Sequence, residues 1–216
     1  MKVRTVHKVP DKHMEYYAFL DACRESSCPI CSLLNKTADH LIGQLLYEEV
    51  NDPEVRKRLR ESLGFCRLHA LLMVRAADGF GTAIIYKDIL EIIRAGLKNH
   101  RILRSTKDCP ICTSLAEREA HWVGTVATHI QDDELKKAIS ASQGFCLDHL
   151  REVLRAVDGK SQQFVAAVHV EKFDAVIYDL GEFIRKHDYR FHGEKFTESE
   201  AGSWQRAVRV MVGGVS

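Results

Sequence analysis

The chain has 216 residues, enough for one large domain or two small ones with a real core. Its hydrophobic fraction of 45% and charged fraction of 28% are those of an ordinary globular protein. The formal net charge of +1 gives no electrostatic footprint for nucleic acid and no polybasic membrane anchor. No apolar run approaches the roughly 18 residues of a membrane span. We therefore expect neither nucleic acid nor a membrane as a partner.

The start of the chain and its cysteine content bear on the compartment. Met1-Lys2-Val3-Arg4 is polar and lacks the apolar centre of a secretion signal. Seven cysteines are an awkward number for a disulfide framework. Both observations predict a cytoplasmic protein, in which closely spaced cysteines bind metal or perform redox chemistry.

Residues 1–11 are predicted to be an irregular polar lead-in. Apolar residues at helical spacing, with cap signals such as Asp52-Pro53 and stop signals such as Gly64, then predict a series of helices. Their predicted ranges are 12–24, 29–50, 53–63, 65–77 and 82–104. No stretch alternates convincingly between apolar and polar residues over the length of a strand. The fold class is therefore predicted to be all-α.

The second half of the chain repeats the first. Cys28-Pro29-Ile30-Cys31 recurs letter for letter as Cys109-Pro110-Ile111-Cys112, an offset of 81. Gly64-Phe65-Cys66-Arg67-Leu68-His69 recurs with the same Gly-Phe-Cys-x-x-His pattern from Gly144 to His149, an offset of 80. Further on, residues 88–94 match residues 179–185 at an offset of 91, which predicts an extended helix over residues 161–189.

This repeat sets the predicted domain boundaries. They are a lead and short helix (1–27), a first metal-binding helical repeat (28–108), a second one (109–192) and a C-terminal helix (193–216). Thr197 to Glu200 has the form of a capping box. The last helix is expected to dock onto the duplicated helical bundle through the apolar side formed by Ala201, Trp204, Ala207, Val208 and Met211.

Each copy carries three thiols and one imidazole, the ligand set of a tetrahedral metal site. Cys-x-x-Cys or Cys-x-x-His at a helix start can direct both side chains at one point, and the helix N-terminus favours the thiolate. We predict two Cys3His sites, each closed within its own copy across the 34 or 33 residues between its motifs. The predicted ligands are Cys28, Cys31, Cys66 and His69 in the first copy, and Cys109, Cys112, Cys146 and His149 in the second.

Zn²⁺, two ions per chain, is the favoured metal because a closed set leaves no open position for a substrate. An iron–sulfur cluster is the main alternative, since three thiolates and an imidazole can also hold iron. A dithiol redox role for Cys-Pro-Ile-Cys is a third reading, weakened by the lack of a βαβ context.

Cys23 has no counterpart in the second copy. It is expected to be a small buried hydrophobe, with a spare ligand or a reactive thiol as the alternative.

A second repeated pair is His40 and His121, each followed three residues later by a glycine, Gly43 and Gly124. Each histidine lies nine residues past the second cysteine of its motif, about 13 Å along a helix, so it cannot join the same tetrahedron. The favoured interpretation is a pair of partly buried core histidines near a helix crossing. The alternative is a catalytic centre built on both.

The two cysteine motifs, together with Ser203-Trp204-Gln205-Arg206-Ala207 and the later Val212-Gly213, resemble an uncharacterised prokaryotic family, the domain of unknown function 6062. The resemblance extends over nearly the whole chain and implies no activity. The residues predict a metal-binding helical protein that acts as a binding or scaffold module for a protein or a small molecule. The alternatives are an iron–sulfur or thiol redox protein, or an enzyme with a pocket at the repeat interface around His40 and His121. Catalysis and oligomeric state stay open.

Overall fold

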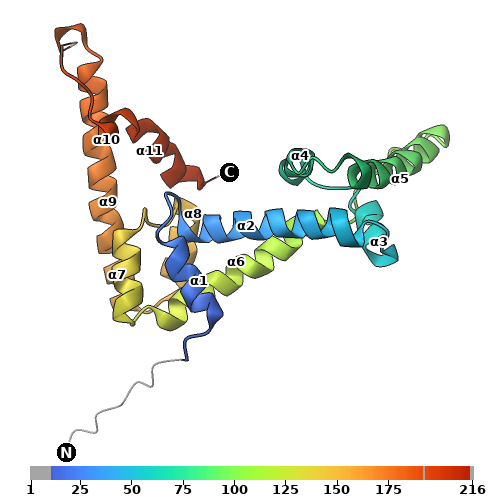
Figure 1. Cartoon of the computed structure of the whole chain (residues 1–216), viewed down its shortest axis with the longest axis horizontal. Helices are drawn as coiled ribbons and strands as arrows, with labels where there is room; N and C mark the ends of the chain where they lie inside the picture. Colours follow the sequence, from blue (N-terminus) through green and yellow to red (C-terminus); the bar gives the residue numbers. More distant parts are fainter. Residues whose placement is uncertain (1–10, 192, 215–216) are drawn as a thin grey trace, which may run out of the picture. The chain divides into compact units, whose positions relative to one another are not determined.

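The computed structural model describes residues 11–191 and 193–214. Over these residues the chain forms α-helices, one π-helical segment and one 3-10 segment, with no β-strand (Figure 1). The prediction of an all-α fold is confirmed. No helix in this part of the chain is long and apolar enough to cross a bilayer. The predicted lead-in lies outside the described residues except for Asp11.

The chain divides into two compact units. The central unit is the continuous stretch Leu34–Glu119, and the terminal unit combines the residues up to Leu33 with those from Ala120 onward. Both boundaries fall inside helices, α2 (Pro29–Gln44) and α6 (Pro110–His129). Each of these helices gives its N-terminal part to one unit and its C-terminal part to the other. The compact units are therefore not the sequence repeats 28–108 and 109–192.

The central unit contains the rest of α2, then η1 (Leu45–Glu49), α3 (Pro53–Glu61), α4 (Arg67–Arg75), α5 (Gly79–Lys98) and the start of α6. The side chain of Asp52 accepts hydrogen bonds from the first turn of α3, as the cap-and-proline signal predicts. Asp88 of α5 forms an ion pair with Arg60 of α3 at 2.8 Å, which ties these two helices together. The core lies between the helices and includes Ala38, Ile42, Leu45, Leu46, Val50, Val55, Leu59, Met73, Ile85, Ile89 and Ile111.

The terminal unit is built from α1 (Met14–Ala22), the first turn of α2, the end of α6, α7 (Asp133–Ala141), α8 (Leu147–Ala156), α9 (Gly159–Lys186), η2 (Tyr189–Phe191), α10 (Glu198–Ala201) and α11 (Ser203–Val212). Asp132 caps α7 and Asp158 caps α9, 80 residues after the caps Asp52 and Asp78. Because Asp78 caps α5 and Asp158 caps α9, these two helices begin a few residues before their predicted starts. Fully buried side chains include Tyr16, Phe19, Ile30, Val126, Leu135, Ile139, Phe145, Val153 and Val165.

The extended helix predicted for the second copy is present. Helix α9 has 28 residues, whereas its counterpart α5 has 20. Helices α10 and α11 lie beside it and α11 also contacts α8, as Figure 1 shows for the orange and red part of the chain. The added length of α9 therefore serves as a platform for the last two helices.

Helix α11 docks as predicted, but the predicted face is wrong. Trp204, Val208 and Met211 are each more than half exposed, at 51%, 54% and 55%. The buried contacts come from Ser203, at the helix start, and Gly213, at its C-cap. Small residues allow the helix to approach its neighbours closely, and apolar periodicity cannot report that. The capping box of Thr197 and Glu200 at the start of α10 is present as predicted.

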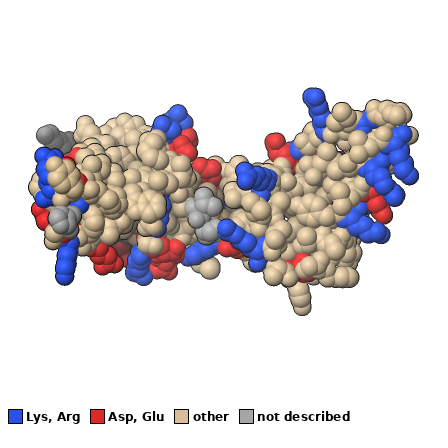
Figure 2. All heavy atoms as spheres, turned by 90° about the horizontal axis from the view of Figure 1, so that it is seen from above, with Lys and Arg blue, Asp and Glu red and all other residues tan. Residues whose placement is uncertain are grey.

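Charges are unevenly spread over the surface. Figure 2 shows many Lys and Arg at one end of the visible face, with a few Asp and Glu among them, and a mixture of both charges elsewhere. The stretch 94–107, which covers the end of α5 and the link to α6, holds exposed Lys and Arg and no acidic residue: Arg94, Lys98, Arg101, Arg104 and Lys107. The expectation that nucleic acid is not a partner stays a prediction.

Candidate metal centres

Four cysteines lie at the starts of four helices. Cys28 and Cys109 directly precede α2 and α6, and Cys66 and Cys146 are the N-cap residues of α4 and α8. Each accepts the first helical hydrogen bond on its carbonyl, at 2.8–3.1 Å between nitrogen and oxygen. The remaining ligands, Cys31, Cys112, His69 and His149, each lie three residues further on. Each Sγ and Nδ1 is therefore positioned at the positive end of a helix dipole, which stabilises a thiolate.

The first group lies in the terminal unit, and we call it the terminal centre. It joins Cys28 and Cys31 of α2 to Cys146 and His149 of α8. The Nδ1 atom of His149 is 3.4 Å from the Sγ atom of Cys28, 3.3 Å from that of Cys31 and 3.2 Å from that of Cys146. The Sγ atoms of Cys31 and Cys146 are 3.7 Å apart.

The second group, the central centre, lies in the central unit and has the same shape. It joins Cys66 and His69 of α4 to Cys109 and Cys112 of α6. The Nδ1 atom of His69 is 3.2 Å from the Sγ of Cys66, 3.5 Å from that of Cys109 and 3.3 Å from that of Cys112. The Sγ atoms of Cys66 and Cys112 are 3.6 Å apart. In each centre all four ligand atoms lie within 4.8 Å of one another, so each could hold a metal ion.

The structure brings all eight predicted ligands into Cys3His groups, but it corrects how they pair. We expected each site to close within one copy, and that prediction is wrong. The Cys-Pro-Ile-Cys motif of each copy meets the Cys-x-x-His motif of the other. All cysteines are free, and the 3.6 and 3.7 Å between the paired sulfur atoms are far beyond the disulfide bond length of about 2.05 Å.

Helix lengths explain the crossed pairing. From Pro29 the chain runs through α2 and η1 to Glu49, a rise of about 30 Å at roughly 1.5 Å per residue. Helix α3 has only nine residues and covers about 13 Å, so it cannot bring Cys66 back to the start of α2. The predicted helix ranges already contained this signal, because a long helix followed by a short one separates the two motifs of a copy.

The side chains of the terminal centre shift one another's pKa values. Hydrogen bonds from the thiols of Cys28 and Cys31 strongly lower the pKa of Cys146, and the same contact raises the pKa of Cys28. Burial by itself would lower the pKa of His149, but hydrogen bonds to the sulfur atoms of Cys146 and Cys31 raise it to about 10. The group therefore holds negative charge on sulfur close to a bound proton, the position that a metal cation would take.

The two centres differ in how well they are covered. In the terminal centre only Cys31 is half-buried and the other ligands are buried, whereas Cys66 and Cys112 are both half-buried in the central centre. Gly213, at the end of α11, provides part of this cover. A Cβ atom at Gly213 would lie 2.6 Å from the Sγ of Cys31 and 3.5 Å from that of Cys146. With φ of 79°, Gly213 also has a backbone that other residues rarely adopt.

The sequence did not predict that Gly213 lies against the cysteines of the terminal centre. A glycine directly after a helical pattern signals the end of that helix, and this signal was present. It does not say which side chains the glycine approaches, because that depends on how α11 packs.

His40 and His121 are not the core histidines that we expected. Both are exposed, and they belong to different units. The Nε2 atom of His121 lies 3.0 Å from a carboxylate oxygen of Glu15 in α1, and neither histidine joins a metal-ligand group in the described chain. A Cβ atom at Gly43 or Gly124 would meet no described atom within 4 Å, so neither glycine is at a close helix crossing. A catalytic centre built on the two histidines gains no support.

Cys23 lies at the C-cap of α1 and is 4% exposed. Burial raises its pKa to about 12, so the thiol stays neutral. It belongs to neither metal-ligand group, and its burial is that of a small hydrophobe.

Comparisons with known proteins agree with the resemblance seen in the sequence. A family of unknown function, DUF6062, matches the chain twice, over residues 18–103 and 97–216. An uncharacterized 23.9 kDa protein in the xynA 3′ region of Caldicellulosiruptor sp. (strain Rt8B.4) is 28% identical over 200 residues, which cover 88% of this chain and 97% of that protein. No solved structure matches the chain. Because the two family matches together span nearly all of it, the chain belongs to the DUF6062 family.

Proposed function

We propose that this protein is a helical binding module whose two units are each held together by one structural Zn²⁺ ion. Cys28, Cys31, Cys146 and His149 bind the ion of the terminal unit. Cys66, His69, Cys109 and Cys112 bind the ion of the central unit. Four protein ligands leave no open position at a tetrahedral ion, so the metals stabilise the fold and the molecule acts through its surfaces and cavities.

The observation that carries this proposal is the spacing of the ligand atoms. A tetrahedral Zn²⁺ has bonds of about 2.3 Å to sulfur and about 2.0–2.1 Å to nitrogen. These bonds imply sulfur–sulfur edges of about 3.8 Å and sulfur–nitrogen edges of about 3.5 Å. The sulfur pairs lie 3.7 and 3.6 Å apart, and the sulfur–nitrogen distances run from 3.2 to 3.5 Å.

The same spacing favours a single ion over an iron–sulfur cluster. A cluster attaches its protein ligands to different iron atoms, and this spreads the ligand atoms more widely. A dithiol redox role is also less well supported, because each Cys-x-x-Cys pair faces a third cysteine and a histidine. The cytoplasmic location remains part of this proposal, since reduced thiols are needed to bind the metal.

Elemental analysis of the full chain, purified under air and under nitrogen, tests the proposal. We expect two zinc ions per chain in both preparations and no visible absorption. Stripping the metal with a chelator at neutral pH should abolish cooperative thermal unfolding, because the ion holds together helices that are distant in sequence. Cys23→Ser removes a cysteine that belongs to neither group, so this control variant should retain both zinc ions. Iron with a visible spectrum, or a metal-free chain that unfolds cooperatively, would contradict the proposal.

A further inference from the structure

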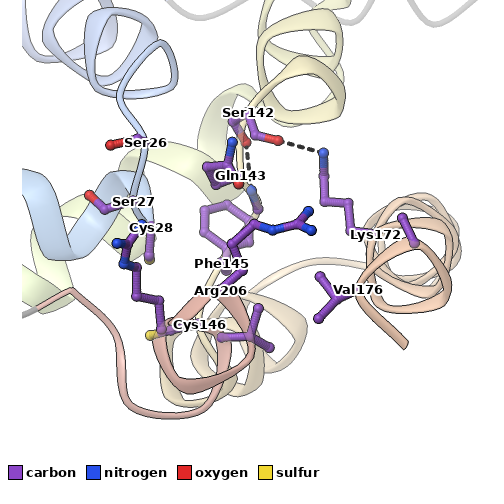
Figure 3. Close-up of a pocket in the computed structure, with 14 residues that line it drawn as sticks. Ser26, Ser27, Cys28, Ser142, Gln143, Phe145, Cys146, Lys172, Val176 and Arg206 are labelled. Carbon is purple, nitrogen blue, oxygen red and sulfur yellow. Dashed lines mark hydrogen bonds between the residues drawn. The ribbon is translucent and has the colours of Figure 1, made fainter. Parts of the chain in front are cut away.

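A hollow beside the terminal centre has a chemistry that the metal ligands do not explain. It has a volume of about 160 Å³ and lies within the terminal unit, between α9, α11, the α7–α8 link and the residues before α2. Figure 3 shows Lys172 and Val176 on one side of it, Ser26 and Ser27 on the other, and Ser142 and Gln143 from the α7–α8 link. A cavity of about 150 Å³ can hold a molecule as large as benzene, so a small ion fits with room for water.

Apart from the sulfur atoms of Cys28 and Cys146, the charged side chains that line the hollow are all basic. They are Lys172, Arg206 and Arg209, and no Asp or Glu lines it. Arg206 is neutralised by Asp179, with 2.5 Å between nitrogen and oxygen. Lys172 donates to the carbonyl oxygens of Ser140 and Ser142 at 2.7 and 2.5 Å, which leaves one of its three N–H groups.

Two positive charges are therefore left without a carboxylate partner in the described chain. Lys172 has only carbonyl partners, and the side chain of Arg209 has no hydrogen-bond or ion-pair partner among the described residues. The side-chain amide of Gln143 adds a neutral donor beside the same space. Donors of this kind, with unpaired positive charge, bind oxyanions.

The duplication provides an internal comparison. If the basic side chains only offset the charge of the thiolates, the central centre would need them as well. At the positions 80 residues earlier, the central unit has Leu63 in place of Gln143 and Ile92 in place of Lys172. No described helix between α5 and α6 corresponds to α11 with its two arginines. The same ligand set is thus built without this polar lining, so the lining has another role.

We propose that this hollow binds a tetrahedral oxyanion of phosphate size, either free phosphate or a phosphoryl group of a small molecule. Lys172 and Arg209 supply the charge, and the Gln143 amide supplies a further hydrogen bond. The inference deepens the proposed binding role by naming a ligand class. It rests on that proposal only through the terminal centre, whose residues Cys28 and Cys146 form part of the wall.

Calorimetric titration of the full chain with inorganic phosphate, at constant ionic strength, tests the inference. We expect saturable binding of one phosphate per chain with a Kd at or below about 1 mM. Arg209→Gln should weaken it at least about tenfold, because a charge-assisted contact is lost. Arg209 is exposed, so this variant keeps its fold, whereas Lys172→Met also removes the tie to Ser140 and Ser142. Arg101→Gln, an exposed arginine in the central unit, is the control and should bind like the wild type.

Zinc is measured in the same samples. A variant that keeps two zinc ions but binds phosphate weakly supports the inference. Phosphate binding that depends on Arg209 in a chain without zinc would overturn the proposed function and leave this inference standing. No saturable binding, equal affinity of Arg209→Gln, equal weakening by Arg101→Gln, or acetate binding as tightly as phosphate would each overturn the inference.

Discussion

His169 and Ile89 occupy equivalent places in the two units. A Cβ atom at Gly144 would lie 3.1 Å from the Nε2 of His169, and one at Gly64 would lie 3.2 Å from the Cδ1 of Ile89. Both side chains are buried, at 2% and 3% exposure. The histidine is neutral, because its Nε2 accepts from the backbone N–H of Phe145 at 2.8 Å while its Nδ1 donates to Val165 at 2.7 Å. It also stacks on the ring of Phe145.

This arrangement predicts a pH dependence. Burial lowers the pKa of His169 below its ordinary value of 6.5, so the folded state favours the neutral ring. The stabilisation is complete above pH 6.5 and falls as the pH decreases toward the folded pKa. His169→Ile, which copies the central unit, should cost about 1–2 kcal/mol at pH 7.5 by leaving the Phe145 N–H unpaired. The difference in unfolding free energy from the wild type should shrink by pH 5.5, as measured by urea denaturation.

Ile89→Val is the control for a mild change at the equivalent place, and its cost should not depend on pH. If the gap between the wild type and His169→Ile stays constant from pH 7.5 to 5.5, the neutral ring does not carry the stabilisation.

At the scale of the helices, the crossed pairing makes a prediction about metal content. Under the observed pairing, Cys31→Ser with His149→Ala damages one centre and leaves one zinc ion per chain. Cys31→Ser with His69→Ala damages both centres and leaves none. Pairing within each copy, as first expected from the sequence, gives the reverse result for the two double variants. Elemental analysis under identical purification decides between them, since each double variant removes one thiol and one imidazole.

Much of the structure at the scale of the helices could be predicted from the sequence. The eight residues of the two Cys3His groups, the helix cap at Asp52 and the capping box at Thr197 follow from local rules that hold wherever the helices pack. Pairing of the ligands does not, because it depends on how far each helix carries the chain. The face of α11 was missed for a related reason. Its contact runs through Ser203 and Gly213, whose small size matters only once a neighbour is in place.

The longer second copy also shows that a sequence match does not predict which residues pack in equivalent places. The sequence match between Asp88 and Asp179 lies at an offset of 91, yet packing equates Ile89 with His169 at an offset of 80. The two aspartates do share a task. Asp88 binds Arg60 of the preceding α3, and Asp179 binds Arg206 of the following α11. The pattern at offset 91 thus marks a repeated ion-pair anchor on the helix surface, placed further along the extended α9.

At the scale of the whole molecule, the two metals should leave at different rates. Two half-buried thiols in the central centre give a chelator more access than the single half-buried Cys31 of the terminal centre. A coloured chelator in excess should therefore release zinc in two phases of one ion each. Cys66→Ser should remove the fast phase, and Cys146→Ser the slow one.

Gly213→Ala sharpens this test. An added methyl group would press on Cys31, and the backbone angles of Gly213 (φ 79°, ψ 178°) cost other residues about 1–3 kcal/mol. The variant should speed the slow phase and leave the fast one unchanged. Gly202→Ala, whose Cβ would make only an ordinary 3.5 Å contact, is the control. A single release phase in the wild type would show that the difference in cover does not govern access.

The central unit is inserted in the sequence of the terminal unit, and this order has a consequence for synthesis on the ribosome. The proposed ligands of the central centre span only 46 residues along the chain, from Cys66 to Cys112, so under the proposed function a metal can be captured before translation ends. Cys28 and Cys31 are made first but must wait for Cys146, which lies 115 residues after Cys31. A nascent chain therefore carries this early thiol pair unprotected for most of its elongation. Oxidation of the pair during that interval would leave a protein with one complete unit and one that cannot close.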